Sequence, residues 1–176
     1  MLQTIKETAS FISKKTNFNP EIGIILGTGL GGLVSEINIQ HSIPYNEIPN
    51  FPVSTVEGHS GRLIFGTLGN KNVVAMQGRF HLYEGYDFET TTIPIDIFHS
   101  LGCKTVIITN AAGCMNQDWK LGSLMLITRC IDFTFKIESP VFLNPWSMFG
   151  GTKNVSPDFI GISCLFMYIV PVPSRK

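Results

Sequence analysis

Hydrophobic residues recur along the chain with two different spacings. Within residues 2–16, Ile5, Ala9 and Ile12 follow one another at the three- and four-residue spacing of a helix. Residues 22–26 form a short, uninterrupted apolar run that is rich in branched side chains. Such a run is typical of a strand that is covered on both faces. The pattern therefore predicts an amphipathic helix followed by a buried central strand.

Further apolar runs predict more strands. Residues 63–68 and 72–76 flank Gly69-Asn70-Lys71 and predict a β-hairpin. Residues 106–109 predict another buried strand, and residues 121–127 predict a turn and a further strand. Strands and helices that alternate in this way indicate an α/β fold, with a mixed, twisted sheet flanked by helices.

A second helix is predicted to follow Asp87. The Asp87 side chain is suited to capping the first turn, and Ile93 and Ile97 mark one face. Pro94 predicts either a kink or a late start of the helix, because proline removes an N–H and crowds the preceding turn. Gly102 predicts its end.

Composition narrows the possible classes of protein. The chain has 176 residues, enough for one domain with a proper core. Thirteen basic and thirteen acidic residues leave no net charge, which argues against a nucleic-acid or anionic-membrane partner. The four cysteines show no C-x-x-C spacing and the four histidines no H-x-x-x-H pair, so we expect no metal site. With no signal-peptide pattern at the start, free thiols in a reducing cytoplasm are expected.

The last part of the chain differs from the rest. Residues 133–176 lack helical or alternating periodicity, so the expected domain is 1–132, followed by an atypical tail. Residues 159–172 are apolar, but the run falls short of the roughly 20 residues that a membrane-spanning helix needs. A membrane anchor is therefore disfavoured.

Two polar stretches follow predicted strands. Gly27, Gly29 and Gly32 satisfy G-x-G-x-x-G, but two prolines at 44 and 49 disfavour the second strand of a dinucleotide-binding unit. The loop then reads either as an anion-binding nest of N–H groups or as a turn without a ligand. The cluster from Arg79 to Glu84 reads either as an anion-binding, proton-transferring corner or as a surface turn with an ion pair.

Convergence of three stretches favours function, because ligands of open α/β sheets gather at strand ends. Thr28, the Arg79-His81 pair and Ala111 are expected to reach one anion. The same stretches resemble the trimeric purine nucleoside phosphorylases, with order and spacing that match from about residue 5 to residue 128. The motifs are Gly27-Thr28-Gly29-Leu30-Gly31, Gly58-His59-Ser60-Gly61-Arg62-Leu63, Gln77-Gly78-Arg79-Phe80-His81-Leu82-Tyr83-Glu84-Gly85-Tyr86 and Thr109-Asn110-Ala111-Ala112-Gly113.

The resemblance implies a purine/uridine phosphorylase-like fold and a reversible phosphorolysis. A purine nucleoside and phosphate would give a free base and ribose 1-phosphate, with phosphate as co-substrate, no cofactor and a homotrimeric assembly. Tyr83 would pack on the ribose, and Glu84 would orient His81 for catalysis. The implied phosphate-binding residues are Thr28, His59, Arg79, Phe80, His81 and Ala111.

The chain departs from the family after about residue 128, where the purine-binding motifs are not recognisable. We therefore expect a truncated or frameshifted chain with an incomplete C-terminal part and little or no activity. Two alternatives stay open: a catalytically inactive phosphate-binding fragment and a methylthioadenosine phosphorylase-like enzyme. A nicotinamide-dependent oxidoreductase is the least favoured interpretation.

Overall fold

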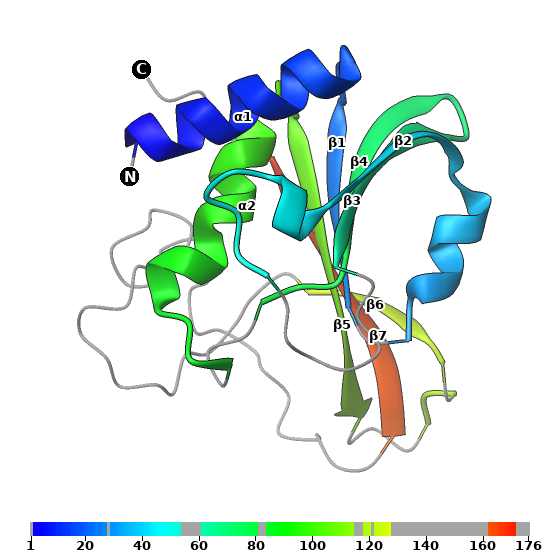
Figure 1. The fold of residues 1–176 in the computed structure, drawn as a ribbon. Coiled ribbons are helices and arrows are strands. Elements are labelled where there is room, and N and C mark those ends of the chain that lie inside the picture. Colours follow the sequence, from blue (N-terminus) through cyan, green and yellow to red (C-terminus); the bar gives the residue numbers. More distant parts are fainter. Residues whose placement is uncertain are drawn as a thin grey trace. The chain divides into compact units, whose positions relative to one another are not determined.

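The computed structural model describes residues 2–27, 29–53, 61–80, 84–114, 118–120, 122–127 and 162–171 (Figure 1). The chain divides into two compact units. The first contains the described residues up to Asn110 together with 169–171, and the second contains those between Ala111 and Tyr168.

The elements of the first unit form an α/β arrangement. In chain order they are α1 (Leu2–Thr16), β1 (Ile22–Leu26), the 3-10 helix η1 (Gly31–Glu36), β2 (Asn38–Pro44), the 3-10 helix η2 (Tyr45–Glu47), β3 (Arg62–Leu68), β4 (Lys71–Gln77), α2 (Phe88–Ser100) and β5 (Thr105–Cys114). The last residues of β5 belong to the second unit. The second unit also holds β6 (Leu124–Leu126) and most of β7 (Ile162–Pro171), which pair in parallel with Met125 opposite Phe166.

The sheet of the first unit is mixed, as predicted. Its strands lie in the order β2-β3-β4-β1-β5. β1 runs parallel to both of its neighbours, with Ile24 opposite Ala75 on β4 and Ile107 on β5. β3 is antiparallel to β2 and to β4, which confirms the predicted hairpin. The parallel strands β4 and β1 therefore end at the same edge of the sheet, where the pairing of β1 with β5 also stops.

One face of the sheet is covered by α1 and α2 (Figure 1). The predicted helical face of α1 packs there, since Ile5, Ala9 and Ile12 are all buried. Phe98 of α2 is fully buried, and it lies against β1 where Gly23 leaves room. A Cβ atom at Gly23 would stand 2.3 Å from Cδ2 of that ring. The buried strand residues on this face are Ile25, Ile43, Leu63, Phe65, Val74, Met76 and Val106.

The opposite face is covered by η1, through Val34 and by Ile37 just after it. Alternate residues of the strands point there, which is why the central strands read as continuous apolar runs. The glycine loop thus leads into a 3-10 helix and then into the antiparallel edge strand β2. A dinucleotide-binding unit requires an α-helix and a parallel strand at this place. The structure thus agrees with the sequence analysis, which argued against a dinucleotide-binding unit.

Several local predictions need correction. α2 begins at Phe88, well before Pro94, so the late start is wrong; Asp87 caps it by accepting a hydrogen bond of 2.7 Å from the Thr90 N–H. β5 continues through Cys114, five residues beyond the strand predicted over residues 106–109. β7 lies in the tail, where the sequence shows no helical or alternating periodicity from which a strand could be predicted.

Candidate functional site

The carboxyl edge is the set of residues that follow β1 and β4, together with the residues of β5 just after its pairing with β1 ends. It consists of 27 and 29–30 after β1, 78–80 after β4, and Thr109 and Asn110 on β5. Ligands of open α/β sheets bind outside the carboxyl ends of such strands. The contacts within this edge therefore decide what chemistry the chain can support.

Thr109 links two strands of the carboxyl edge through its side chain. The residue is 5% exposed, and its hydroxyl accepts a hydrogen bond of 2.9 Å from the Gly27 N–H. The same hydroxyl donates to the Ile25 carbonyl over 3.0 Å. Burial of unpaired polar groups is costly, so these two bonds hold the end of β1 firmly against β5.

The glycine loop begins at a very close approach between backbones. A Cβ atom at Gly27 would lie 2.4 Å from the Thr109 carbonyl oxygen, so only glycine fits there. The Leu30 N–H donates to the Gly27 carbonyl over 3.3 Å, which closes a four-residue turn. Gly29 has φ +85°, a left-handed conformation that glycine adopts without steric cost. Thr28 lies outside the described residues.

Arg79 reaches the same threonine from β4. Its Nη1 atom donates to the Thr109 carbonyl over 3.1 Å, and the side chain is half-buried. Gly78, with φ +110°, makes the backbone change direction just before it. A guanidinium presents a planar fork of donors that matches phosphate oxygens. The structure thus brings Arg79 and the start of the glycine loop to one residue of β5.

An aromatic cluster supports the turn that carries Arg79. The fully buried Tyr45 donates from its hydroxyl to the Gly78 carbonyl over 2.7 Å. Its ring centroid lies 5.5 Å from that of Phe80 and 4.9 Å from that of Phe51. Tyr86 packs on Phe80 with 5.8 Å between centroids. Burial raises the pKa of Tyr45, so its hydroxyl stays protonated and continues to donate.

The predicted site residues fall into two groups. Arg79, Phe80 and Glu84 lie in the first unit, where the Phe80 side chain is buried in the aromatic cluster and Glu84 is half-buried. Ala111 belongs to the second unit and is exposed on β5. The predicted residues outside the described part of the chain are Thr28, His59, His81 and Tyr83. The assignment of all these residues to phosphate, ribose or catalysis stays a prediction.

The sequence analysis assigns no individual role to two residues that hold the carboxyl edge in place. Thr109 enters it only as the end of a strand and the first residue of a motif, and Tyr45 lies between the two prolines at 44 and 49. A threonine that directly follows a buried apolar run was the available signal for the first. No sequence signal singles out the second.

The described residues offer neither a metal site nor a membrane-spanning helix. Among the described residues, no group of three or more His, Cys, Asp or Glu side chains is placed to hold a metal ion. Within the same part of the chain, no helix is long and apolar enough to cross a membrane. Cys103 is a free, buried thiol.

Comparisons with known proteins converge on one family. The family model described as "Phosphorylase superfamily" matches residues 21–165. Purine nucleoside phosphorylase 1 of Geobacillus stearothermophilus is 51% identical over 124 residues, which are 70% of this chain and 45% of the relative. The chain therefore spans about half the length of the curated relatives it matches.

Solved structures give the same result. A purine nucleoside phosphorylase in complex with ribose-1-phosphate matches with a TM-score of 0.66 and 50% identity, over 71% of this chain and 46% of that one. The Schistosoma mansoni purine nucleoside phosphorylase in complex with inosine matches with a TM-score of 0.64 and 47% identity, over 71% and 44%. These values confirm the predicted fold class.

Proposed function

The chain belongs to the phosphorylase superfamily, and from this membership we propose that it acts as a purine nucleoside phosphorylase. The reaction is the phosphate-dependent cleavage of the N-glycosidic bond of a purine ribonucleoside or deoxyribonucleoside. Its products are the free base and ribose 1-phosphate or deoxyribose 1-phosphate. Inorganic phosphate is the co-substrate, and no further cofactor takes part.

The observation that supports this proposal most is the meeting of Arg79 and the glycine loop on Thr109. A cation and a tight, glycine-rich turn at the ends of parallel strands form a suitable cradle for a phosphate dianion. Relatives at 50% and 47% identity have been solved with ribose-1-phosphate and with inosine, which supports the same class of ligand.

The chemistry asks little of the protein beyond position and charge. As the C1′–N bond breaks, its electron pair leaves with the purine, which takes up a proton, and positive charge develops on the sugar. The phosphate dianion stabilises that charge and forms the new C1′–O bond. In this proposal Arg79 fixes the dianion beneath the sugar, so most of the rate comes from proximity and electrostatics.

The remaining roles follow the predicted positions. Thr28, His59, Phe80, His81 and Ala111 complete the phosphate site. Tyr83 packs on the ribose, and Glu84 orients His81 as the catalytic pair. A homotrimer in a reducing cytoplasm is part of the same proposal, as is a domain boundary near residue 132.

Calorimetry with inorganic phosphate tests the proposal. The parent chain is expected to bind phosphate with measurable heat, and Arg79→Ala is expected to abolish it. Arg62→Ala is the matched control, because it removes the same group from the neighbouring strand β3, where Nε donates to Gln77 over 2.7 Å. Absence of heat with the parent chain, or equal loss in both variants, contradicts the proposed site.

A second candidate is a non-catalytic phosphate-binding protein. It is favoured by the sequence after residue 128, in which the family's purine-binding motifs are not recognisable. Inosine plus phosphate, followed by hypoxanthine release, separates the two functions. Turnover near the typical enzyme value of about 10 per second supports the phosphorylase. Phosphate binding without hypoxanthine release supports the second candidate, and replacing inosine with methylthioadenosine tests the related phosphorylase.

A further inference from the structure

Thr109 stands where the parallel pairing of β1 and β5 stops. The register between these strands ends with Ile25 opposite Ile108. One residue later the Thr109 hydroxyl replaces the backbone ladder, accepting from the Gly27 N–H and donating to the Ile25 carbonyl. Both backbone groups stay satisfied while the chain leaves β1 and enters its turn.

This hydroxyl fixes the first residue of the glycine loop. The Gly27 N–H opens the turn that the Leu30 N–H closes, and Gly27 lies too close to the Thr109 backbone for any side chain. A shift of the loop along the edge would either break a buried hydrogen bond or produce a backbone clash. The position of this loop is therefore set from β5, by a residue 82 positions away.

The carbonyl of the same residue holds the arginine. Arg79 Nη1 donates to it over 3.1 Å, from the opposite side of β1 in strand order. One buried residue thus contacts two of the groups in this unit that are proposed to bind phosphate. Its hydroxyl holds the loop, and its main-chain oxygen holds the guanidinium.

We infer that Thr109 is a positioning residue of the phosphate site, which sets the glycine loop and Arg79 at the spacing that one phosphate requires. This inference rests on the proposed function and assigns no contact between Thr109 and phosphate itself. A loop displaced by a fraction of an ångström presents its N–H groups at the wrong place, and binding weakens even though the fold is kept.

A purely structural threonine makes the same kinds of bond, so a matched control is needed. Thr16, at the end of α1, is also 5% exposed. Its hydroxyl donates to the Ile12 carbonyl over 2.9 Å and accepts from the Phe18 N–H over 3.3 Å. Thr16→Val therefore removes an equivalent pair of buried hydrogen bonds from a different part of the first unit.

The experiment measures phosphate affinity by calorimetry and the melting midpoint for the full chain and its variants. Thr109→Val keeps the shape of the side chain and deletes the hydroxyl, whereas Thr109→Ser keeps the hydroxyl. We expect Thr109→Val to weaken phosphate binding by about tenfold or more, because both hydrogen bonds of the hydroxyl are lost. Thr109→Ser is expected to stay within about threefold of the parent chain. Thr16→Val is expected to lower the melting midpoint without changing phosphate affinity.

Other outcomes contradict the inference in distinct ways. If Thr109→Val and Thr16→Val lower the melting midpoint alike and both bind phosphate as the parent does, Thr109 is only structural and the proposed function stands. If the parent chain binds no phosphate, the proposed site fails and the positioning role fails with it. Should Thr109→Val not fold, Thr109→Cys replaces it, since a thiol bonds only weakly; parent-like affinity in that variant overturns the inference.

Discussion

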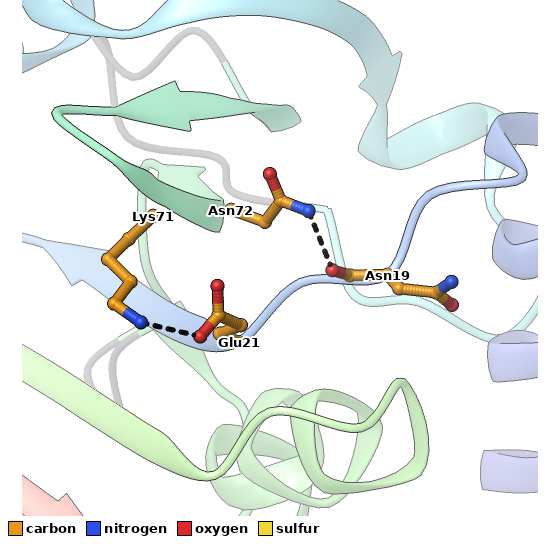
Figure 2. Close-up of polar contacts among 4 residues, drawn as sticks. All are labelled: Asn19, Glu21, Lys71 and Asn72. Carbon is orange, nitrogen blue, oxygen red and sulfur yellow. Dashed lines mark hydrogen bonds and ion pairs between the residues drawn. The ribbon is translucent and has the colours of Figure 1, made fainter.

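The two edges of the sheet in the first unit are joined in opposite ways. At the carboxyl edge, Thr109 is buried and its hydroxyl and carbonyl bind Gly27 and Arg79. The amino edge is the opposite end of the same strands, where β1, β4 and β5 begin, and it includes Glu21, Lys71 and Lys104. There Glu21 accepts a hydrogen bond from Lys71 Nζ over 2.8 Å, and both side chains are about half exposed (Figure 2). Each edge links residues that are distant in sequence, but only the first does so away from water.

The amino edge is nevertheless well connected through its backbone. The Glu21 N–H donates to the Asn72 carbonyl and the Lys104 N–H donates to the Glu21 carbonyl, each over 2.9 Å. Asn72 Nδ2 donates to the Asn19 carbonyl over 3.3 Å (Figure 2). The strands are thus joined here by main-chain bonds, and the exposed ion pair is an addition that solvent screens. Comparison of the two edges shows that the buried hydrogen bonds of the carboxyl edge fix the positions of side chains, whereas the exposed ion pair of the amino edge does not.

The largest effect is expected from Gly27→Ala at the carboxyl edge. A new Cβ atom would meet the Thr109 backbone, which has no flexible end that can move aside. We expect a loss of about 3 kcal/mol in the free energy of unfolding, as in severe overpacking, together with loss of phosphate binding. Urea unfolding and calorimetry measure the two.

Gly31→Ala is its control, since nothing lies within 4 Å of a Cβ atom at Gly31. Equal stability of the two variants would mean that the close approach of β1 and β5 does not constrain the loop.

Tyr45→Phe tests whether the hydrogen bond from Tyr45 to Gly78 stabilises the turn that carries Arg79. It leaves the buried Gly78 carbonyl without its donor, at a cost of about 1–2 kcal/mol in unfolding free energy. Tyr86→Phe removes a bond of 2.6 Å to the exposed Val53 carbonyl and is expected to cost less. Chemical denaturation compares them; a larger loss in the Tyr86 variant would reverse the order given by burial.

Alkaline pH tests the burial of Cys103, the thiol next to Lys104 at the amino edge. Burial raises the pKa of Cys103 from its ordinary 9.0 to about 12. The thiol of the unfolded chain ionises above pH 9, whereas the folded thiol stays protonated up to about pH 12. The unfolding free energy is therefore unaffected by ionisation of Cys103 below pH 9 and falls as pH rises from 9 to 12. Cys103→Ala is expected to flatten the fall of unfolding free energy with pH, by at most about 1.4 kcal/mol per pH unit. Denaturant titrations at several pH values measure it; an unchanged slope contradicts it.

The smallest effect is expected from Glu21→Gln. The hydrogen bond from Lys71 lowers the pKa of the Glu21 carboxyl, so any stabilisation is present above pH 4.5 and is lost as pH falls through the folded value. Because both side chains are exposed, the melting midpoint at neutral pH should change little, and added salt should remove the change. A drop comparable to that of Gly27→Ala would show that the two edges do not differ as burial suggests.

Sequence patterns identified the elements that are buried on a fixed period. α1 was predicted from the spacing of Ile5, Ala9 and Ile12, which all pack in the core. β2 was missed, because an edge strand buries few side chains; Ile43 is buried there, whereas Ile39 is 43% exposed. The extension of β5 was missed because small residues at 110–113 resemble a loop, although sheet hydrogen bonding does not depend on side-chain size.

The site was predictable only in part for a related reason. Arg79 carries its chemistry in its own side chain, so a cation beside glycines was enough to indicate anion binding. Thr109 is important because it contacts the residues that follow two other strands, Gly27 after β1 and Arg79 after β4. Hydroxyl side chains are common in strands, so a threonine at this position does not stand out in the sequence. Residue type reveals groups that act on ligands, whereas groups that act on other residues become visible only once the strands are placed.

Gly23 and Phe98 carry one more consequence. The Phe98 ring occupies the volume that a methyl group at residue 23 would need, so a side chain at residue 23 and a large ring at residue 98 cannot both fit. Any relative with a larger residue at the first should have a smaller one at the second. In an alignment these positions would then vary together, as a signature of how tightly α2 is seated on the middle strand.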